Sequence, residues 1–208
     1  MSTETLQRLT RRQVTERRIA DVAAMAAKSF AAHRVAPLWV ALPFDGACET
    51  GVSAWRCAKP GDCAYAFTLY SVPGRLIVCG DLGTLVLERT YDMLVWARGS
   101  IDSIDYFAEK VTREIATEEF DPDMVRAWVH ETDQEVLEGE HSDKFALAWR
   151  GELRREFLDA AEEGEHEAYR VYHESPLNDG DPPSWDNWKY GFLWQREAIK
   201  WFLARWPA

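Results

Sequence analysis

The sequence predicts an α+β fold, in which an antiparallel β-meander of about four to five strands has helices packed on one face and is followed by a helical C-terminal half. Three observations lead to this class. Residues 1–35 have apolar side chains at helical spacing, residues 36–90 have short apolar runs divided by Gly, Pro and Asp, and residues 91–208 return to the helical period. With 208 residues, 47% of them hydrophobic and 28% charged, the chain suits one soluble domain with a sizeable core.

The first half of the chain predicts one helix and then a sheet. From Val14 to Phe30 the apolar residues fall at about helical spacing, and the alanine-rich stretch between them favours a helix over residues 1–35. The segment Val72-Pro-Gly-Arg75 fits a type II turn, and Gly80-Asp-Leu-Gly83 turns the chain again, so neighbouring strands are expected to be antiparallel. The expected strands are Leu38–Leu42, Val52–Cys57, Ala64–Ser71, Arg75–Cys79 and Thr84–Arg89.

The second half predicts helices, each bounded by a cap or a glycine. Asp121-Pro122 is a start signal, because a capping carboxylate is followed by proline at the first helical position. Ser142 is expected to cap the next helix, and Gly164 to end it. The expected helices are Tyr91–Arg98, Ser103–Glu118, one from Pro122 to about Leu137, one from Ser142 to Gly164, Glu165–His173, and a last helix capped by Ser184 that runs to Trp206.

Charge is unevenly distributed along the chain. The formal net charge is −11, but residues 101–187 alone contain 25 acidic and eight basic side chains, a net charge of −17. Such a protein is a poor direct binder of nucleic acid, because phosphate contacts need clustered Lys and Arg. The negative charge instead predicts a surface that imitates the charge density of DNA and competes with nucleic acid for a positively charged channel of another protein. The carboxylates predicted to form this partner-binding face are Glu118, Glu119, Asp121, Asp123, Glu131, Asp133, Glu135 and Glu138.

Tryptophan is abundant, and four of the ten tryptophans lie in the last 21 residues. On the predicted final helix, Trp185, Trp188 and Phe192 begin one apolar stripe, which is expected to be buried in the core. Trp194 and Trp201 belong to a second stripe, which predicts a partner-binding surface or a homodimer interface, because tryptophan is enriched at binding hot spots.

No catalytic or metal-binding motif stands out. The sequence has no nucleophile elbow, Walker loop, H-E-x-x-H motif or G-x-G-x-x-G loop, so neither a catalytic residue nor a cofactor is predicted. The cysteines Cys48, Cys57, Cys63 and Cys79 are separated by eight, five and fifteen residues, which differs from zinc-knuckle spacing and favours reduced, buried thiols. An enzyme remains an alternative, and it would need a polar pocket lined by residues such as Asp81, Arg98, Asp102 and Tyr106.

One part of the chain carries a resemblance. The stretch Tyr70–Gly83, continuing through Val86 and Tyr91–Gly99 to Ser103–Val111, resembles a recurring type of small protein that tailed phages and prophages encode. The resemblance covers about 40 residues, and it implies no catalytic residue.

A phage setting implies a counter-defence role, such as that of an anti-CRISPR protein. The expected partner is a host defence nuclease or effector complex, bound in the cytoplasm of the host cell through the acidic face. No secretory signal and no membrane span are expected, because the N-terminus is polar and the longest apolar runs are short. The alternatives are a small phage enzyme that acts on a nucleotide or signalling molecule, and a homo-oligomeric accessory protein.

Overall fold

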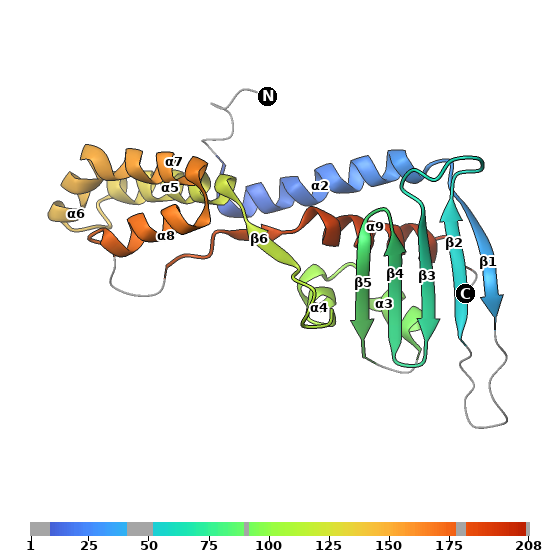
Figure 1. Ribbon diagram of the computed structural model, residues 1–208. Helices are drawn as coiled ribbons and strands as arrows, with labels where there is room; N and C mark the ends of the chain where they lie inside the picture. Colours follow the sequence, from blue (N-terminus) through green and yellow to red (C-terminus); the bar gives the residue numbers. More distant parts are fainter. Residues whose placement is uncertain (1–8, 41–51, 90–91, 178–181, 207–208) are drawn as a thin grey trace. The chain divides into compact units, whose positions relative to one another are not determined.

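The computed structural model describes residues 9–40, 52–89, 92–177 and 182–206. The protein is α+β, with a five-stranded antiparallel sheet, a second two-stranded sheet and a helical C-terminal half (Figure 1). It divides into two compact units, which are described separately below. The sheet unit comprises Ile19–Thr117 and Lys189–Ala208, and the helical unit comprises Met1–Arg18 and Glu118–Trp188.

The sheet unit is built on a meander in which each strand pairs with the next in sequence. Its strands are β1 (Arg34–Val40), β2 (Ser53–Ala58), β3 (Phe67–Val72), β4 (Arg75–Gly80) and β5 (Gly83–Glu88). The predicted turn between β3 and β4 is present, with Gly74 at φ +81° in the position that requires a left-handed residue. Four of the five predicted strands therefore match to within about three residues. β1 begins at Arg34, earlier than the predicted Leu38, and the predicted end at Leu42 lies outside the described residues.

One face of this sheet forms the core of the sheet unit. Leu69, Val78 and Leu85 stand opposite one another across three strands, and each is at most 2% exposed. Helix α3 (Met93–Ser100) packs against β3 and β4, and α9 (Tyr190–Leu203) packs against β5. Both helices lie behind the sheet in Figure 1, so the strands alternate between a covered face and an open one.

The N-terminal helix is shorter than predicted. Helix α2 extends over Arg11–Phe30, and the chain enters β1 at Arg34, so the prediction of helix to residue 35 was wrong at its C-terminal end. Phe30 is 1% exposed and packs edge-on against Phe67 of β3, with ring centroids 5.5 Å apart. This contact fixes the point at which the chain turns from the helix into the sheet.

The predicted helix Ser103–Glu118 was also wrong over most of its length. Only α4 (Ile104–Ala108) is helical, and the chain then runs along the free edge of β5. Glu88 N donates to Lys110 O at 2.8 Å, and Thr112 N donates to Val86 O at 3.0 Å. The apolar spacing after Ser103 is compatible with a helix. The segment is extended instead, because its backbone forms hydrogen bonds with the otherwise unpaired backbone groups on the outer edge of β5.

The helical unit contains the N-terminal part of α2 and a helical segment that begins and ends in a short sheet. β6 (Glu118–Phe120) pairs with β7 (Asp186–Trp188), so the two ends of the segment lie side by side. Between them the elements are α5 (Pro122–Glu138), α6 (Asp143–Ala148), a π-helical turn (Trp149–Leu153), α7 (Arg154–Glu163) and α8 (Glu165–Glu174). The predicted start signals at Asp121-Pro122 and Ser142 are confirmed, as is the break at Gly164.

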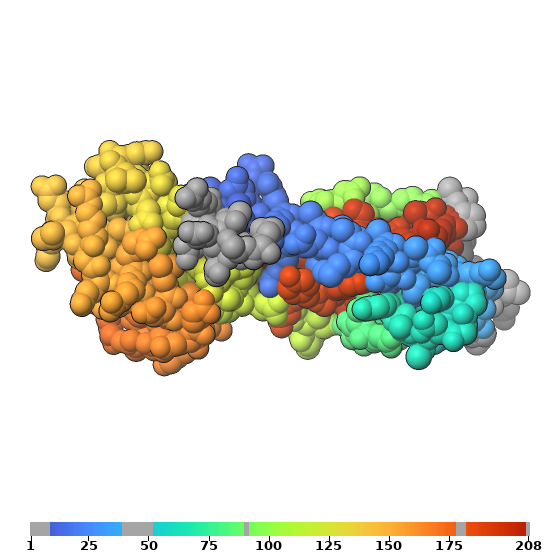
Figure 2. Space-filling model, turned by 90° about the horizontal axis from the view of Figure 1, so that it is seen from above, coloured from blue at the N-terminus to red at the C-terminus, as the bar shows by residue number. Residues whose placement is uncertain are grey.

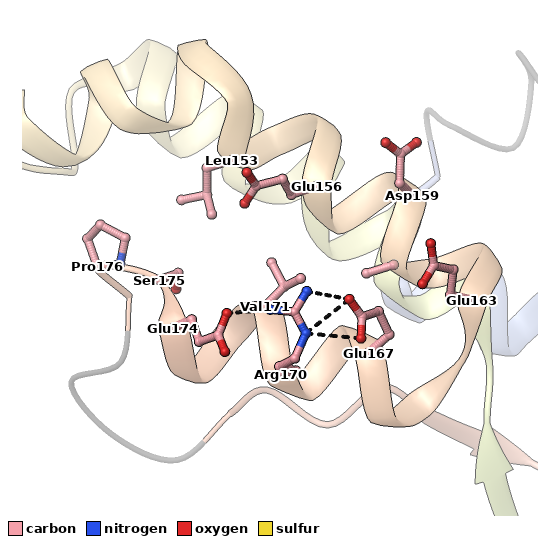
Figure 3. Close-up of a pocket in the computed structure, with 11 residues that line it drawn as sticks. Leu153, Glu156, Asp159, Glu163, Glu167, Arg170, Val171, Glu174, Ser175 and Pro176 are labelled. Carbon is pink, nitrogen blue, oxygen red and sulfur yellow. Dashed lines mark hydrogen bonds and ion pairs between the residues drawn. The ribbon is translucent and has the colours of Figure 1, made fainter.

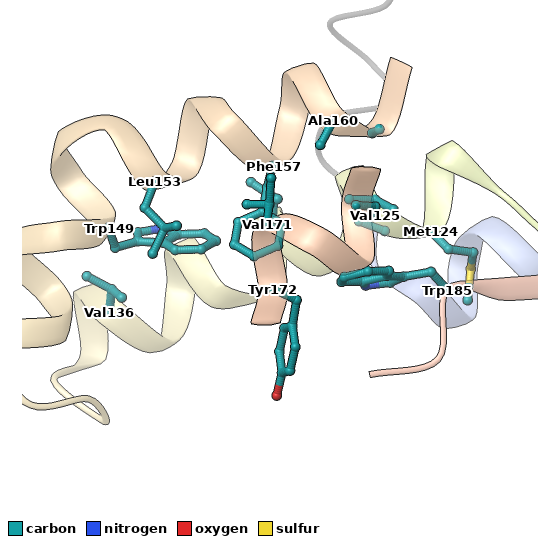
Figure 4. Close-up of a cluster of buried hydrophobic side chains, with 14 of the residues drawn as sticks. Met124, Val125, Val136, Trp149, Leu153, Phe157, Ala160, Val171, Tyr172 and Trp185 are labelled. Atoms are coloured by element: carbon teal, nitrogen blue, oxygen red, sulfur yellow. The ribbon is translucent and has the colours of Figure 1, made fainter. Parts of the chain in front are cut away.

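Aromatic side chains fill the core of the helical unit (Figure 4). Trp149, Phe157 and Trp185 are each at most 1% exposed. Trp128 of α5 packs edge-on against Phe157, with ring centroids 4.8 Å apart, and lies 5.7 Å from Trp185. Burial of such rings stabilises this unit, since each removes about 150–250 Å² from water.

The last helix begins later than predicted. Residues 182–185 are not helical, β7 follows, and α9 begins at Tyr190 instead of after a Ser184 cap. Trp185 and Trp188 therefore lie outside the helix and do not form its predicted apolar stripe. The periodicity of the sequence was misleading here. Trp185 is buried in the core of the helical unit, and the backbone that carries it is not helical.

Candidate functional site

The structure places the net negative charge of the chain in the helical unit. By sequence, this unit has 23 acidic and 11 basic residues, a net charge of −12, whereas the sheet unit has 12 acidic and 13 basic residues, a net charge of +1. The acidic block seen in the sequence is therefore a property of one folded unit. Its helices α5 to α8 are the part of the surface coloured yellow to orange in Figure 2.

The predicted acidic residues at the start of α5 serve mainly to hold the fold. The Asp121 carboxylate, 6% exposed, accepts hydrogen bonds from Asp123 N at 3.0 Å and from Asn187 Nδ2 at 2.9 Å. Arg18 Nη1 lies 3.6 Å from both Asp121 Oδ2 and Glu119 Oε1. Asp123 pairs with Arg126, and Glu118 lies at the first position of β6.

The remaining predicted carboxylates follow α5 towards its C-terminus. Glu131 accepts from Arg11 Nε at 2.7 Å, and Asp133 accepts from both Arg154 and the indole N–H of Trp149. Glu135 lies 3.0 Å from His141 Nε2. Glu138 is exposed and has no ion pair within the described part of the chain. Most of the α5 carboxylates thus have an internal basic or hydrogen-bonding partner, and α5 presents less free charge than its sequence suggests.

A second acidic array, on α7 and α8, lines an open groove of about 440 Å³ (Figure 3). Glu156, Asp159 and Glu163 project from α7, and Glu167 and Glu174 project from α8 on the other wall. The floor is apolar and comprises Leu153, Ala160 and Val171. Such a groove offers a partner negative walls and a hydrophobic floor.

One cation lies within this groove, and it is already neutralised. Arg170 Nε lies 3.0 Å from both carboxylate oxygens of Glu167, and its guanidinium also bonds to Glu174. The hydrogen bond from Arg170 lowers the pKa of Glu167, and the same bond raises the pKa of Arg170. Both groups are therefore charged at neutral pH, and their charges cancel.

The acids on the α7 wall are less compensated. Glu156 and Glu163 have no ion pair among the described residues, and Asp159 approaches Arg155 only at 3.9 Å, with both side chains mostly exposed. These three acids are spaced by three and four residues, where like charges on a helix repel by about 0.2–0.5 kcal/mol per pair. These three acids form an acidic stripe and therefore lower the stability of α7 in the isolated protein. This favours a role in binding a partner over a role in stabilising the fold.

The spacing that identifies this stripe is present in the sequence. Glu156, Asp159 and Glu163 recur at intervals of three and four residues, which places them on one face of α7. The prediction instead relied on the density of acids around α5. Density alone does not show which acids will be paired with arginines that are distant in sequence.

The two tryptophans predicted to bind a partner are packed within the sheet unit. Trp201 is 9% exposed and lies 6.0 Å from Phe30 between ring centroids, with Arg205 stacked over it at 4.2 Å. Trp194 is half-buried and stacks on Tyr65, with ring centroids 5.3 Å apart. These positions favour a packing role for Trp201 and leave only part of Trp194 at the surface.

The side chains named for the alternative enzyme have separate local roles. Asp102 forms an ion pair with Lys200 at 2.9 Å, which lowers the pKa of Asp102, and Arg98 donates to Trp206 O at 2.8 Å. Tyr106 lies between Arg89 and Lys110, and Asp81 is exposed. Each of the first three therefore engages its own partners.

Cysteine and histidine offer little metal chemistry in the described ranges. Cys57 is fully buried, and burial raises the pKa of its thiol to about 12, whereas Cys63 is exposed and Cys79 is partly exposed. Cys48 lies outside the described residues. Within the parts of the chain that the structure describes, no group of three or more His, Cys, Asp or Glu side chains is arranged to hold a metal ion.

The comparisons with known proteins give no assignment. No protein-family model, no curated protein and no solved structure matches this chain. Among the described helices, none is both long enough and apolar enough to cross a bilayer.

Proposed function

We propose that this protein is a binding protein whose helical unit docks on a cationic surface of another protein. The observation that carries the proposal is the segregation of charge, with −12 in the helical unit against +1 in the sheet unit. A surface of this kind accelerates association with a positively charged partner and repels nucleic acid of its own sign.

The α7–α8 groove supports this proposal more strongly than α5 does. Its α7 wall presents Glu156, Asp159 and Glu163, whose charges are little compensated from within the unit. A protein segment with basic side chains on one face and apolar ones on the other would match both the walls and the floor. Ion pairs formed there would be partly shielded from solvent and would gain more than exposed pairs do.

The class of partner follows from the resemblance of residues 70–111 to small phage proteins. In that setting we propose a counter-defence role in the cytoplasm of the host cell, with a host nuclease or effector complex as the partner. Such complexes hold nucleic acid in a positively charged channel, which an acidic protein can occupy instead. The expected mode is therefore occlusion of nucleic acid, without catalysis and without direct binding to DNA.

The test is a competition experiment with purified CRISPR effector complexes and labelled target DNA. The protein is expected to displace DNA from at least one complex, with a potency that falls steeply as salt rises. A triple variant with Glu156→Gln, Asp159→Asn and Glu163→Gln is expected to weaken displacement at least tenfold.

The matched control removes the same charge from other exposed positions of the helical unit. It combines Glu138→Gln, Asp143→Asn and Glu165→Gln, and it is expected to retain most of the potency. Equal losses in both triple variants would show a nonspecific effect of charge and overturn the assignment to the groove. Failure of the unaltered protein to displace DNA from any complex tested would overturn the proposed function.

A further inference from the structure

A second hollow of the helical unit combines aromatic walls with carboxylates. It has a volume of about 450 Å³ and lies among α5, the turn before α6, α6 itself and α8. This volume lies in the range of clefts that bind small molecules, roughly 300–1,000 Å³, and exceeds what a single ion needs. Its lining includes three aromatic side chains and two carboxylates, which are Trp128, Phe145, Tyr172, Glu135 and Glu140.

Three aromatic side chains line this hollow from different elements. Trp128 belongs to α5, Phe145 to α6 and Tyr172 to α8, and the ring centroids of Trp128 and Tyr172 are 6.5 Å apart. Tyr172 is 5% exposed and belongs to the buried cluster, and in Figure 4 its hydroxyl end is directed away from the other labelled side chains. Packing against Trp149 and Phe157 fixes the Trp128 ring in place, so the wall that it forms is preorganised.

Two carboxylates give the same hollow a negative charge. His141 Nε2 lies 3.0 Å from Glu135 Oε2, which leaves Oε1 for a further donor. Glu140 is exposed, and its carboxylate has no ion pair within the described ranges. The His141 ring itself lies against Phe145, with centroids 4.4 Å apart, so that Glu135 is held beside an aromatic wall.

We propose that this hollow, formed by Trp128, Phe145 and Tyr172 with Glu135 and Glu140, binds an arginine guanidinium. A guanidinium is planar, stacks on aromatic faces and is only weakly hydrated, and it donates two parallel hydrogen bonds to a carboxylate. An ammonium group is more strongly hydrated and lacks the planar fork, so lysine fits the combination of aromatic wall and carboxylate less well. In its biological context this inference rests on the proposed function, because the arginine would belong to the cationic partner.

The site is tested without the partner by a blocked arginine amide, observed by NMR of the full chain labelled with ¹⁵N. The indole N–H signal of Trp128, assigned by its loss in Trp128→Phe, is expected to shift in a saturable manner. The neutral isostere, a blocked citrulline amide, is expected to bind at least tenfold more weakly, and a blocked lysine amide several-fold more weakly.

Variants distinguish the site from general attraction of cations. The double variant Glu135→Gln, Glu140→Gln is expected to lose at least tenfold in affinity for the arginine amide, while Glu138→Gln binds it as the unaltered protein does. Equal binding of citrulline, or no effect of the double variant, would overturn the proposal.

Failure here is separable from failure of the proposed function. If arginine amide does not bind while DNA competition succeeds, the arginine site is wrong and the acidic groove stands. If arginine amide binds while competition fails, the site stands and the partner class is wrong.

Discussion

Replacement of Asp121 by alanine is expected to destabilise the helical unit by about 1.5–5 kcal/mol, although Asp121 is one of the acids that the sequence assigned to a binding face. Its Oδ1 caps α5 by accepting from Asp123 N, and loss of such a cap costs about 0.5–2 kcal/mol. Its Oδ2 accepts from Asn187, which is 3% exposed, and an amide left unsatisfied in that position costs about 1–3 kcal/mol. The expected total is a large fraction of the roughly 5–15 kcal/mol by which native proteins are stable.

The assay is urea denaturation together with hydrogen exchange measured by mass spectrometry. Because the chain has two units, exchange is needed to locate the loss, which is expected over α5 and β7 and not in the sheet. Asp121→Asn keeps an acceptor for the cap and is expected to lose less than Asp121→Ala. The control is Glu138→Ala, an exposed change at the end of the same helix, which is expected to stay within about 0.5 kcal/mol of the unaltered protein. If Asp121→Ala is as mild as this control, the structural role given to Asp121 is refuted.

Four further predictions concern individual residues. Trp185→Ala is expected to cost about 3–5 kcal/mol in unfolding free energy, because a fully buried ring is removed from the core. Gly80→Ala is expected to cost about 1–3 kcal/mol or more in the same measurement, because an added Cβ would lie 2.2 Å from the backbone oxygen of Ala66, which cannot move aside. Cys63 is expected to react with maleimide in the folded protein, whereas Cys57 is expected to react only after unfolding, as mapped by mass spectrometry. Burial raises the pKa of Cys57 from its ordinary value of 9.0 to about 12. The buried neutral thiol therefore contributes its full stability below pH 9.0, and this contribution is lost as the pH rises from 9.0 towards 12. Denaturation at several pH values would detect the loss.

The elements that sequence predicted well are those whose causes are local. Pro122 after Asp121, Ser142 before α6 and Gly164 after α7 each act on the backbone within a few residues, and the structure has a helix boundary at each. The turn at Gly74 is another example, because a positive φ is required there whatever surrounds it.

The elements that sequence missed depend on partners that are far away in the chain. Val111 pairs with Leu87 on the edge of the sheet, and Trp185 enters a core made mainly by α5 to α8. In both places the apolar spacing is compatible with a helix. The chain is extended instead, because Val111 pairs with a strand that is distant in sequence and Trp185 is buried among helices that are distant in sequence.

The candidate site shows the same division between local and distant causes. The α5 acids were predicted from their density, but Arg11 pairs with Glu131 across 120 positions in sequence, and Arg18 reaches Glu119 and Asp121. No local pattern reveals such pairing. The acidic stripe on α7, in contrast, can be recognised from its spacing of three and four residues. A prediction from the local density of acids does not detect this spacing.

The way in which charge is divided argues for a role in binding rather than for solubility alone. Solubility requires only a net charge away from zero, and an even distribution over 208 residues would provide it at little cost. Concentrating 23 acids in the helical unit instead produces repulsion within that unit, which Arg11, Arg126 and Arg154 relieve in part through ion pairs. The arginines relieve it on α5 and, through Arg126, at Glu162 of α7. Glu156 and Glu163 of α7 are left without such a partner among the described residues. Repulsion that is tolerated at one face and relieved at another is expected when the first face meets an outside partner. The α7 wall is therefore the part of the molecule where removal of negative charge should stabilise the isolated protein and weaken its association.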